Sequence, residues 1–318
     1  MKARPAAPLS RKDAAIACCL LLLCVVGRGQ RLDKVITLPY DAMLPAGHNS
    51  IAFNPQARLL YISGSKSESL CVMDERKSVV TAMLDLGYCV SSLCFNPRVG
   101  KLYCAAGSSC AILALEGVSG SVLSEIRVPD ALTSLVLDSA HNRVYGLCRN
   151  GAIAVVDCSQ DRLLCAPLVA SALGDTCPAV CVEGLDRLYV GSSADSTVFV
   201  FDCAGDSVVA RIDLASTPLA LCYHTPNGLL YCSCADDTNL LVINPTSNQP
   251  VDSVPGAGGN LLMCSNSTSN KVYVVVEGDL LAVSGETNTV LANIYGGDSY
   301  SLTWNSRRNK VYLTTSSW

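Results

Sequence analysis

His48, His141 and His224 are the three histidines of the chain, and histidine is the side chain best suited to proton transfer or metal binding near neutral pH. They lie at different phases of an internal repeat and in different copies of it. A shared catalytic or metal-binding role would require them to converge, and this placement does not predict that. Each histidine is instead expected in a surface turn, and the sequence predicts no catalytic residue, no metal ion and no cofactor.

Glu183, Asp236 and Asp237 lie near the ends of predicted strands. A hydrolytic enzyme could use such acids as general bases around the mouth of a binding channel. Loop carboxylates are common on an acidic protein, however, and we interpret these three as surface residues. The sequence also contains no Gly-x-Ser-x-Gly nucleophile motif and no phosphate-binding glycine loop.

Cysteine is abundant, with 18 residues in the chain, of which 15 follow residue 29. Cys94, Cys222 and Cys264 each lie nine residues before a tyrosine of the repeat, where other copies carry alanine or valine. Because small apolar residues alternate with cysteine at this position, we interpret most of the cysteines as compact core residues.

Disulfide bonds are the second interpretation of the cysteines, with Cys177 and Cys181 as one example, and their connectivity does not follow from the sequence. Zinc is the third. The pairs Cys177/Cys181 and Cys232/Cys234 lack the two-residue separation of typical zinc-binding pairs, and no second pair follows at the spacing of a zinc finger.

A repeat of about 42 residues organises most of the chain. Its marker is a tyrosine that follows Leu or Val, usually preceded by Lys or Arg, as in Lys101-Leu102-Tyr103. The spacings between successive markers are 42, 42, 44, 42, 42 and 39 residues, and periods of this length are typical of propellers and other repeat folds. The seven structural anchors are Tyr61, Tyr103, Tyr145, Tyr189, Tyr231, Tyr273 and Tyr312.

Each repeat contains four short apolar segments, separated by turn residues, that predict strands a to d. Strand a precedes the tyrosine and is closed by Asn-Pro at residues 54–55, and strand b contains the tyrosine. Strand c ends in Asp or Asn, as at residues 72–74, and strand d follows, as at residues 79–83. The Asp or Asn can accept hydrogen bonds from the next backbone amides and so start a turn. Four strands in 40-odd residues form one blade of a β-propeller.

Blades stack on one another to bury both of their faces, and stacking around an axis protects the sheet edges. Closing the ring requires strands from both chain ends, and residues 34–39 are predicted as strand d and residues 310–313 as strand b of one blade. The chain ends at Trp318, before the expected strand c. The sequence therefore predicts an all-β, seven-bladed β-propeller of four-stranded antiparallel blades. Its last blade, closed by N- and C-terminal strands, either has three strands or belongs to a chain that has been cut.

The segments at residues 270–274 (Asn-Lys-Val-Tyr-Val), 309–312 (Asn-Lys-Val-Tyr) and 198–202 (Val-Phe-Val-Phe-Asp) resemble the YVTN repeats of surface-layer and periplasmic (YncE-like) propellers. The resemblance spans nearly the whole chain after residue 29 and implies the fold. It implies less about function, because members are mostly binding or cell-envelope proteins and some relatives are enzymes. The chain lacks the Trp-Asp dipeptide of WD40 blades and the paired glycines of kelch blades.

The first 29 residues differ in kind from the rest. Basic residues at positions 4, 11 and 12 precede the apolar run 14–26, whose 13 residues fall short of the roughly 20 that a membrane-spanning helix needs. We predict a signal peptide at residues 1–29, cleaved between Gly29 and Gln30, and a propeller at residues 30–318. A membrane anchor that is never cleaved is the alternative.

The net charge argues against a nucleic-acid partner. Residues 1–29 hold five basic residues and one acidic residue, so their removal leaves 18 basic and 26 acidic residues and a net charge of −8. Nucleic-acid binding draws most of its affinity from Lys and Arg contacts with phosphate, which such a surface would repel.

Two functions are compatible with these features. Export, ring closure and the lack of a catalytic motif favour a non-catalytic, monomeric binding or scaffold module of the cell envelope, periplasmic, surface-bound or secreted, whose loops bind a protein or glycan. The alternative is a small-molecule enzyme of the propeller-lactonase type that uses the central channel. Polar side chains converging on one channel mouth would favour the enzyme, whereas a channel lined by Ala, Cys and Val would favour the binding module.

Overall fold

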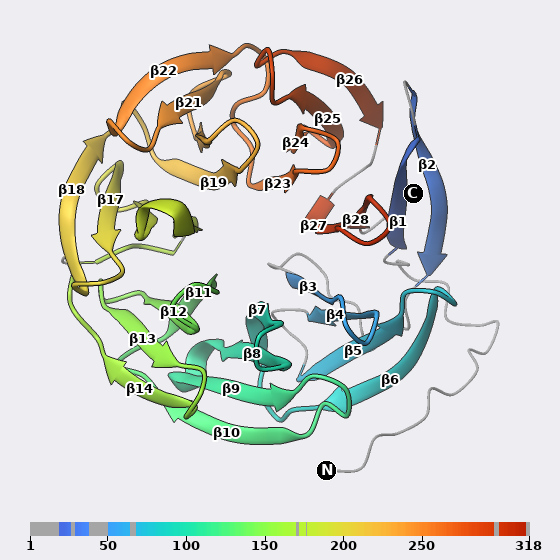
Figure 1. Cartoon of the computed structure of the whole chain (residues 1–318), viewed down its shortest axis with the longest axis vertical. Helices are drawn as coiled ribbons and strands as arrows, with labels where there is room; N and C mark the ends of the chain where they lie inside the picture. Colours follow the sequence, from blue (N-terminus) through green and yellow to red (C-terminus); the bar gives the residue numbers. More distant parts are fainter. Residues whose placement is uncertain are drawn as a thin grey trace.

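The computed structural model describes residues 19–26, 29–37, 50–63, 68–169, 172–175, 177–295 and 299–315. Within these ranges the chain forms strands β1 to β28 and two short 3₁₀ turns, η2 (Gly107–Ser109) and η3 (Glu183–Leu185), arranged as blades around a central axis (Figure 1). The same ranges contain no helix with the length and apolarity needed to cross a membrane. Residues 1–18 of the predicted signal peptide, His48 and Trp318 lie outside the described residues.

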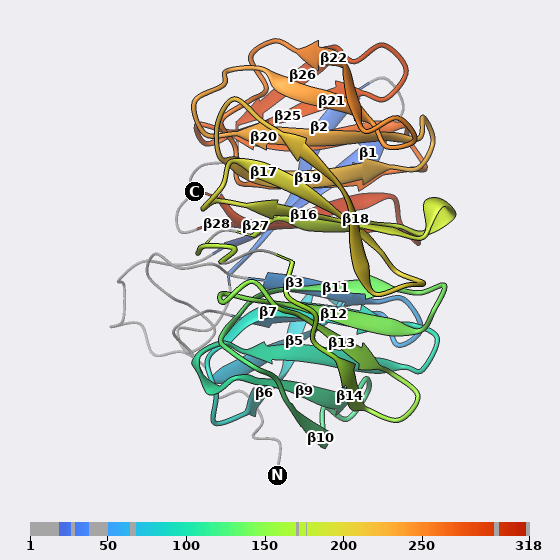
Figure 2. The same ribbon diagram turned by 90° about the vertical axis from the view of Figure 1, so that its left-hand side faces the viewer.

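Six blades are each built from four antiparallel strands that are consecutive in the chain. The first strand of each lies next to the axis and the fourth on the outside of the ring (Figures 1 and 2). The first three blades are β3 (Ser50–Asn54), β4 (Leu59–Ser63), β5 (Ser69–Asp74), β6 (Val79–Asp85); β7 (Val90–Asn96), β8 (Lys101–Ala106), β9 (Ala111–Glu116), β10 (Val122–Arg127); and β11 (Leu132–Asp138), β12 (Arg143–Cys148), β13 (Ile153–Asp157), β14 (Arg162–Cys165). The next three are β15 (Ala179–Val182), β16 (Arg187–Ser192), β17 (Thr197–Asp202), β18 (Ser207–Asp213); β19 (Pro218–His224), β20 (Leu229–Cys234), β21 (Leu240–Asn244), β22 (Gln249–Val254); and β23 (Leu262–Asn266), β24 (Lys271–Val276), β25 (Asp279–Ser284), β26 (Val290–Tyr295).

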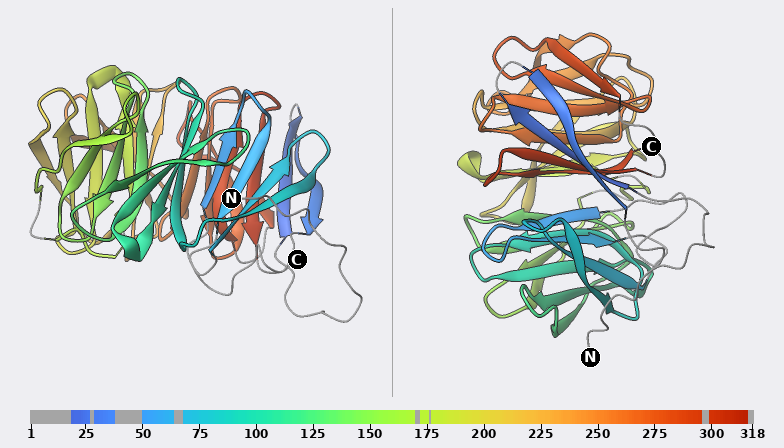
Figure 3. Two further views of the ribbon diagram at one scale, coloured as in Figure 1. Left: turned by 90° about the horizontal axis from the view of Figure 1, so that it is seen from below. Right: turned by 90° about the vertical axis from the view of Figure 1, so that its right-hand side faces the viewer.

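A further four-stranded sheet combines the two ends of the described chain in the order β27, β28, β1, β2 (Figure 3). Its inner strands are β27 (Ser299–Asn305) and β28 (Lys310–Thr315), and its outer strand is β2 (Gly29–Thr37). The predictions of a strand near residues 34–39 and of another at residues 310–313 are thereby confirmed.

Strand c of this composite sheet was expected to be missing, and that prediction is wrong. Strand β1 (Cys19–Val26) occupies the position between β28 and β2, pairing with both. It is formed by residues that we assigned to the signal peptide, because a continuous apolar run of eight residues suits a signal peptide and a buried strand equally well. The described chain thus forms six blades of consecutive strands rather than the seven predicted, and its two ends form the composite sheet beside them.

The turns that follow strands a and c depend on Asn and Asp side chains, as the sequence predicted for strand c. Asn54 Oδ1 accepts hydrogen bonds from the amides of Gln56 and Ala57, both at 3.0 Å. Asp74 Oδ1 accepts from the amides of Arg76 (2.8 Å) and Lys77 (3.0 Å) in the same way. These short-range bonds satisfy backbone groups at the strand ends and set where each strand stops.

The seven anchor tyrosines, together with Phe201, are the largest fully buried side chains of the described residues. Several of their hydroxyl groups reach the following blade. Tyr103 donates to Asp161 Oδ1 at 2.7 Å, and Tyr189 donates to the carbonyl oxygen of Pro245 at 2.7 Å. Both acceptors lie in the turn between the third and fourth strands of the next blade. These two tyrosines fill a blade interface and hydrogen-bond across it. Tyr145 instead donates to Asp138 Oδ2 of its own blade at 3.3 Å, and the Tyr273 hydroxyl has no hydrogen-bond partner among the described residues.

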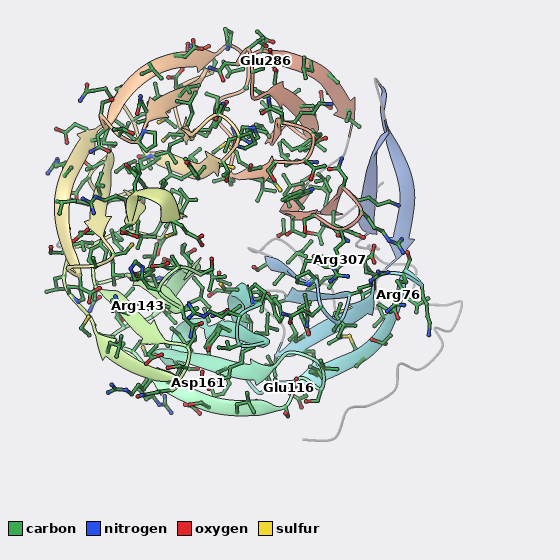
Figure 4. All side chains as sticks on the ribbon, viewed as in Figure 1. Arg76, Glu116, Arg143, Asp161, Glu286 and Arg307 are labelled. Carbon is green, nitrogen blue, oxygen red and sulfur yellow. The ribbon has the colours of Figure 1, made fainter. Side chains whose placement is uncertain are left out.

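The basic residue two positions before the tyrosine has a related role. Lys101 Nζ pairs with Asp161 Oδ2 at 2.7 Å, and Arg143 Nη1 pairs with Asp206 Oδ1 at 3.2 Å, again in the next blade. Figure 4 shows Arg143 and Asp161 between blades and well away from the ring axis. In these two blades the basic residue of the Lys/Arg-Leu/Val-Tyr pattern therefore contacts the next blade, whereas Arg187 pairs with Asp202 of its own blade.

The 15 cysteines from Cys71 to Cys264 are all free thiols, and most are buried. Cys104, Cys222 and Cys232 pack within hydrophobic clusters at blade interfaces, which agrees with their interpretation as core residues. The suggested Cys177–Cys181 disulfide is not formed, because Cys177 lies in the loop before β15 and directs its thiol to the carbonyl oxygen of Gly174 at 3.3 Å.

Candidate ligand site at the channel mouth

A cavity of about 780 Å³ lies at one end of the central channel. Residues from the innermost strands β3, β7, β11, β15, β19, β23 and β27 line it, joined by the loops that lead into these strands. The strands contribute residues near their N-terminal ends, so the cavity opens on the face of the ring where the fourth strand of one blade connects to the first strand of the next. Its volume is within the usual range of ligand pockets.

The charged residues of the cavity come from one side of the ring. Asp130 precedes β11, Arg149 follows β12, and Asp175 precedes β15. Arg149 Nε lies 3.4 Å from Asp175 Oδ1, and both side chains are largely exposed. The backbone of Arg149 is held from two sides, because its amide donates to Ala131 and its carbonyl oxygen accepts from Leu173.

The opposite side of the cavity is apolar. Leu219 of β19, Met263 of β23 and Leu302 of β27 line it, and Leu261, just before β23, is 53% exposed. The cavity wall is therefore divided into a charged sector on the third and fourth blades and an apolar sector on the following sheets.

Most hydroxyl groups near the mouth are already used within the ring. Ser50 Oγ accepts from the amide of Leu93 (3.0 Å), and Ser92 Oγ accepts from the amide of Leu135 (3.1 Å), so each serine links its strand to the innermost strand of the next blade. Thr133 Oγ1 donates to the carbonyl oxygen of Leu147 at 3.2 Å. The two serines link neighbouring blades and Thr133 bonds within its own blade, and among the described residues no base at hydrogen-bonding distance activates these hydroxyls as nucleophiles.

Cys177, a thiol at the channel mouth, is also unsuited to nucleophilic attack. Burial is the main cause that raises the pKa of this thiol, to about 11, so the thiol stays protonated at neutral pH. Since the thiolate is the reactive form of cysteine, we assign Cys177 a packing role.

The acids considered from the sequence do not converge. Asp236 and Asp237 follow β20 on the same face as the cavity but do not line it, and Asp237 Oδ1 accepts from the amide of Asn239 at 2.8 Å. Glu183 follows β15 at the opposite face, where its carboxylate accepts from the Ser139 hydroxyl and amide of the preceding blade. Their positions agree with their interpretation as surface residues.

The described histidines also lie on the face opposite the cavity, and one prediction about them is wrong. His141 lies in an exposed turn as expected, but His224 is completely buried. His224 Nδ1 lies 2.8 Å from Ser265 Oγ and Nε2 lies 2.8 Å from Asn270 Oδ1, both in the next blade. His224 is the last residue of β19, and four other sheets carry asparagine at the equivalent position. The imidazole makes the contact with the next blade in place of an asparagine side chain.

The burial of His224 predicts a pH-dependent stability. Desolvation lowers its pKa below the ordinary value, so the unfolded chain binds the proton first as the pH falls. The stabilising contribution of the neutral imidazole is complete above about pH 6.5 and decreases below it. In urea unfolding between pH 7.5 and 5.5, wild type should lose more stability than the His224→Asn variant. Equal pH slopes for the two chains would contradict this assignment.

No sequence motif marks the charged sector of the cavity. Asp130, Arg149 and Asp175 stand in loops whose composition resembles that of many surface turns. Each of them lies beside the N-terminal end of an innermost strand, either in the loop before it or in the neighbouring hairpin. Alignment of the repeats would therefore have placed all three residues at the same face of the ring.

Comparison with known proteins supports the fold. No family model matches the chain, and no curated protein matches it in sequence. Many solved structures share its architecture. One is hydrazine synthase from Kuenenia stuttgartiensis, with a TM-score of 0.71 and 16% sequence identity over 85% of this chain and 93% of that one. At this identity the similarity shows the β-propeller fold alone.

Proposed function

We propose that the protein is an exported, non-catalytic propeller of the YVTN type that binds an amphipathic segment of a partner protein at the channel mouth. The composite sheet serves as its seventh blade. The observation that carries the binding function is the division of the cavity wall into the charged sector at Asp130, Arg149 and Asp175 and the apolar sector at Leu219, Leu261 and Met263.

An amphipathic peptide segment fits this division. An apolar side chain of the partner would cover the exposed Leu261, while a charged side chain would reach Arg149 or its acidic neighbours. The Arg149–Asp175 pair is solvent-exposed, and such pairs contribute at most about 1 kcal/mol, so it can exchange partners at little cost. Burying the side chain of Leu261 would contribute roughly 1.5–3 kcal/mol to binding.

The binding site is tested with one substitution in the apolar sector and one matched control. Leu261→Asp places a charge in the cavity, whereas Leu185→Asp places one on a leucine that is 36% exposed in η3, on the opposite face. Each chain is used as bait on envelope extract, and the affinity for the captured partner is then measured with purified components. We expect roughly 10- to 100-fold weaker binding for Leu261→Asp and unchanged binding for Leu185→Asp.

Two results would overturn the proposed binding function. One is retention of the partner by Leu261→Asp with the affinity of wild type. The other is hydrolysis of a lactone or ester by the wild-type chain that is lost in Arg149→Ala, which would instead favour the small-molecule enzyme.

Export is proposed from the basic residues and apolar run before Gln30. Cleavage after Gly29 would remove β1, which lies between β28 and β2, so β2 would then have to pair with β28 directly. N-terminal sequencing of the protein secreted by a bacterial host decides the matter. Gln30 as first residue supports processing, and a start before Cys19 leaves β1 in the sheet and contradicts it.

A further inference from the structure

A cluster of metal-binding side chains lies between the blades β11–β14 and β15–β18. A carboxylate oxygen of Asp138, Cys181 Sγ and Cys203 Sγ all lie within 4.8 Å of one another. Asp138 is the last residue of β11, Cys181 lies in β15, and Cys203 follows β17. Asp138 and Cys203 are buried and Cys181 is half-buried.

The repeat brings the same three positions together at other blade interfaces. At the interface of the first and second blades, Asn54 Nδ2 donates to the carbonyl oxygen of Gly117 at 2.6 Å. Between the blades β19–β22 and β23–β26, His224 contacts Ser265, and a side chain at Gly285 would collide with the imidazole. These positions therefore form a recurrent polar contact. Only between the third and fourth blades do two thiols and a carboxylate occupy all three, among the interfaces whose residues the structure describes.

The position of Cys181 holds the small Ser265 in the blade β23–β26, but large side chains fill it in several other blades. Phe95 occupies it in the second blade and stacks on Tyr61 of the first, with ring centroids 6.4 Å apart. Leu137 and Tyr223 are its counterparts in two further blades. At Cys181 a smaller side chain replaces this bulky one, and its sulfur atom lies close to Asp138 and Cys203.

We propose that Asp138, Cys181 and Cys203 bind a zinc ion that joins the third and fourth blades. Zinc prefers four ligands in tetrahedral arrangement, at about 2.3 Å for thiolate sulfur and about 2.0–2.2 Å for carboxylate oxygen. The three ligand atoms lie within 4.8 Å of one another. Small side-chain adjustments therefore place each of them at its bond length from one central ion. Two soft thiolate ligands favour zinc over magnesium or calcium. Binding releases the two thiol protons to solvent, and water or the Tyr145 hydroxyl fills the fourth position.

The neighbours of Asp138 are suited to orient its carboxylate. His141 Nδ1 lies 2.8 Å from Asp138 Oδ2, and the Tyr145 hydroxyl donates to the same oxygen at 3.3 Å. The amide of His141 donates to Asp138 Oδ1 at 3.0 Å. Such outer contacts fix a metal-binding carboxylate, and their loss typically weakens metal affinity about 10- to 100-fold. His141 is therefore a positioning residue of this site.

The proposal is tested by zinc stoichiometry and by cobalt substitution on the full chain kept reduced. Cys203→Ser removes one ligand, and Cys158→Ser is the matched control, because Cys158 is also buried and follows the third strand of its blade. After dialysis against chelator-buffered zinc, wild type and Cys158→Ser should each retain one more equivalent of zinc than Cys203→Ser. Cobalt should give a thiolate charge-transfer band in the same two chains only.

Two further variants separate metal binding from packing. Asp138→Asn introduces the residue found at this position in other blades, so the chain should fold but lose tight zinc binding. His141→Ala should keep the cobalt thiolate band while binding zinc about 10- to 100-fold more weakly. Equal zinc content in wild type and Cys203→Ser, or a Cys181–Cys203 disulfide in peptides from protein prepared without reductant, would overturn the proposal. The site lies on the face opposite the channel mouth, so neither outcome affects the proposed ligand site.

Discussion

Tyr189→Ala is expected to lower the free energy of unfolding by about 3–5 kcal/mol, the cost of removing a fully buried aromatic side chain from a packed core. The side chain fills the interface between the fourth and fifth blades, and its hydroxyl donates to the carbonyl oxygen of Pro245 and to Asn248 Oδ1 at 2.8 Å. Equilibrium unfolding in urea measures the loss.

Tyr189→Phe separates the hydroxyl from the ring. It keeps the packing and leaves the two acceptors in the next blade without their donor, so we expect a smaller loss of about 1–2 kcal/mol. A phenylalanine variant as unstable as the alanine variant would mean that the hydrogen bonds, rather than the packed ring, hold this interface. An alanine variant with wild-type stability would contradict the anchor role altogether.

Arg308→Ala is expected to destabilise the contact that closes the ring. Glu75, in the turn after β5, is 2% exposed, and Arg308 Nε lies 2.7 Å from its Oε1 while the Tyr312 hydroxyl donates to the same oxygen at 3.2 Å. Loss of Arg308 leaves a buried carboxylate without its cation. Because the arginine side chain is itself 36% exposed, we expect a loss of about 2–3 kcal/mol rather than the full value for a buried pair.

Arg307→Ala is the matched control, because this exposed neighbour also lies at the junction of the last sheet with the first blade (Figure 4). Its effect on stability should stay within about 0.5 kcal/mol. Glu75→Gln removes the buried charge, so Arg308→Ala should cost markedly less in that background. Equal costs in both backgrounds would show that the ion pair does not contribute to closure.

The fold could be predicted because its determinants are local and repeated. Tyr103 contacts Asp161 in the next blade, and a buried tyrosine that recurs in every repeat leaves a period in the sequence. The Asn54 and Asp74 turns were predictable for a similar reason, since each side chain bonds amides only two or three residues away.

Features that depend on contacts between distant residues could not be predicted in this way. His224 occupies a turn-like position in the sequence, and its burial follows from Ser265 and Asn270 some forty residues later. Cys181 lies in β15 and Cys203 follows β17, and the two meet Asp138 of another blade, so no spacing motif marks them. Apolarity alone does not distinguish a signal peptide from a buried strand. The position of β1 could therefore be recognised only from its pairing with β28 in the structure.

The pairing of Cys19 with Thr315 has a consequence for the covalent path of the chain. The two residues are direct partners at the end of an antiparallel pair, as the residues that flank a hairpin loop are in the other blades. A short linker between them would make β28 and β1 an ordinary hairpin. New termini could then be opened in any exposed loop between two blades, and such circular permutants should keep the ring, because the contacts between blades do not depend on where the backbone is interrupted.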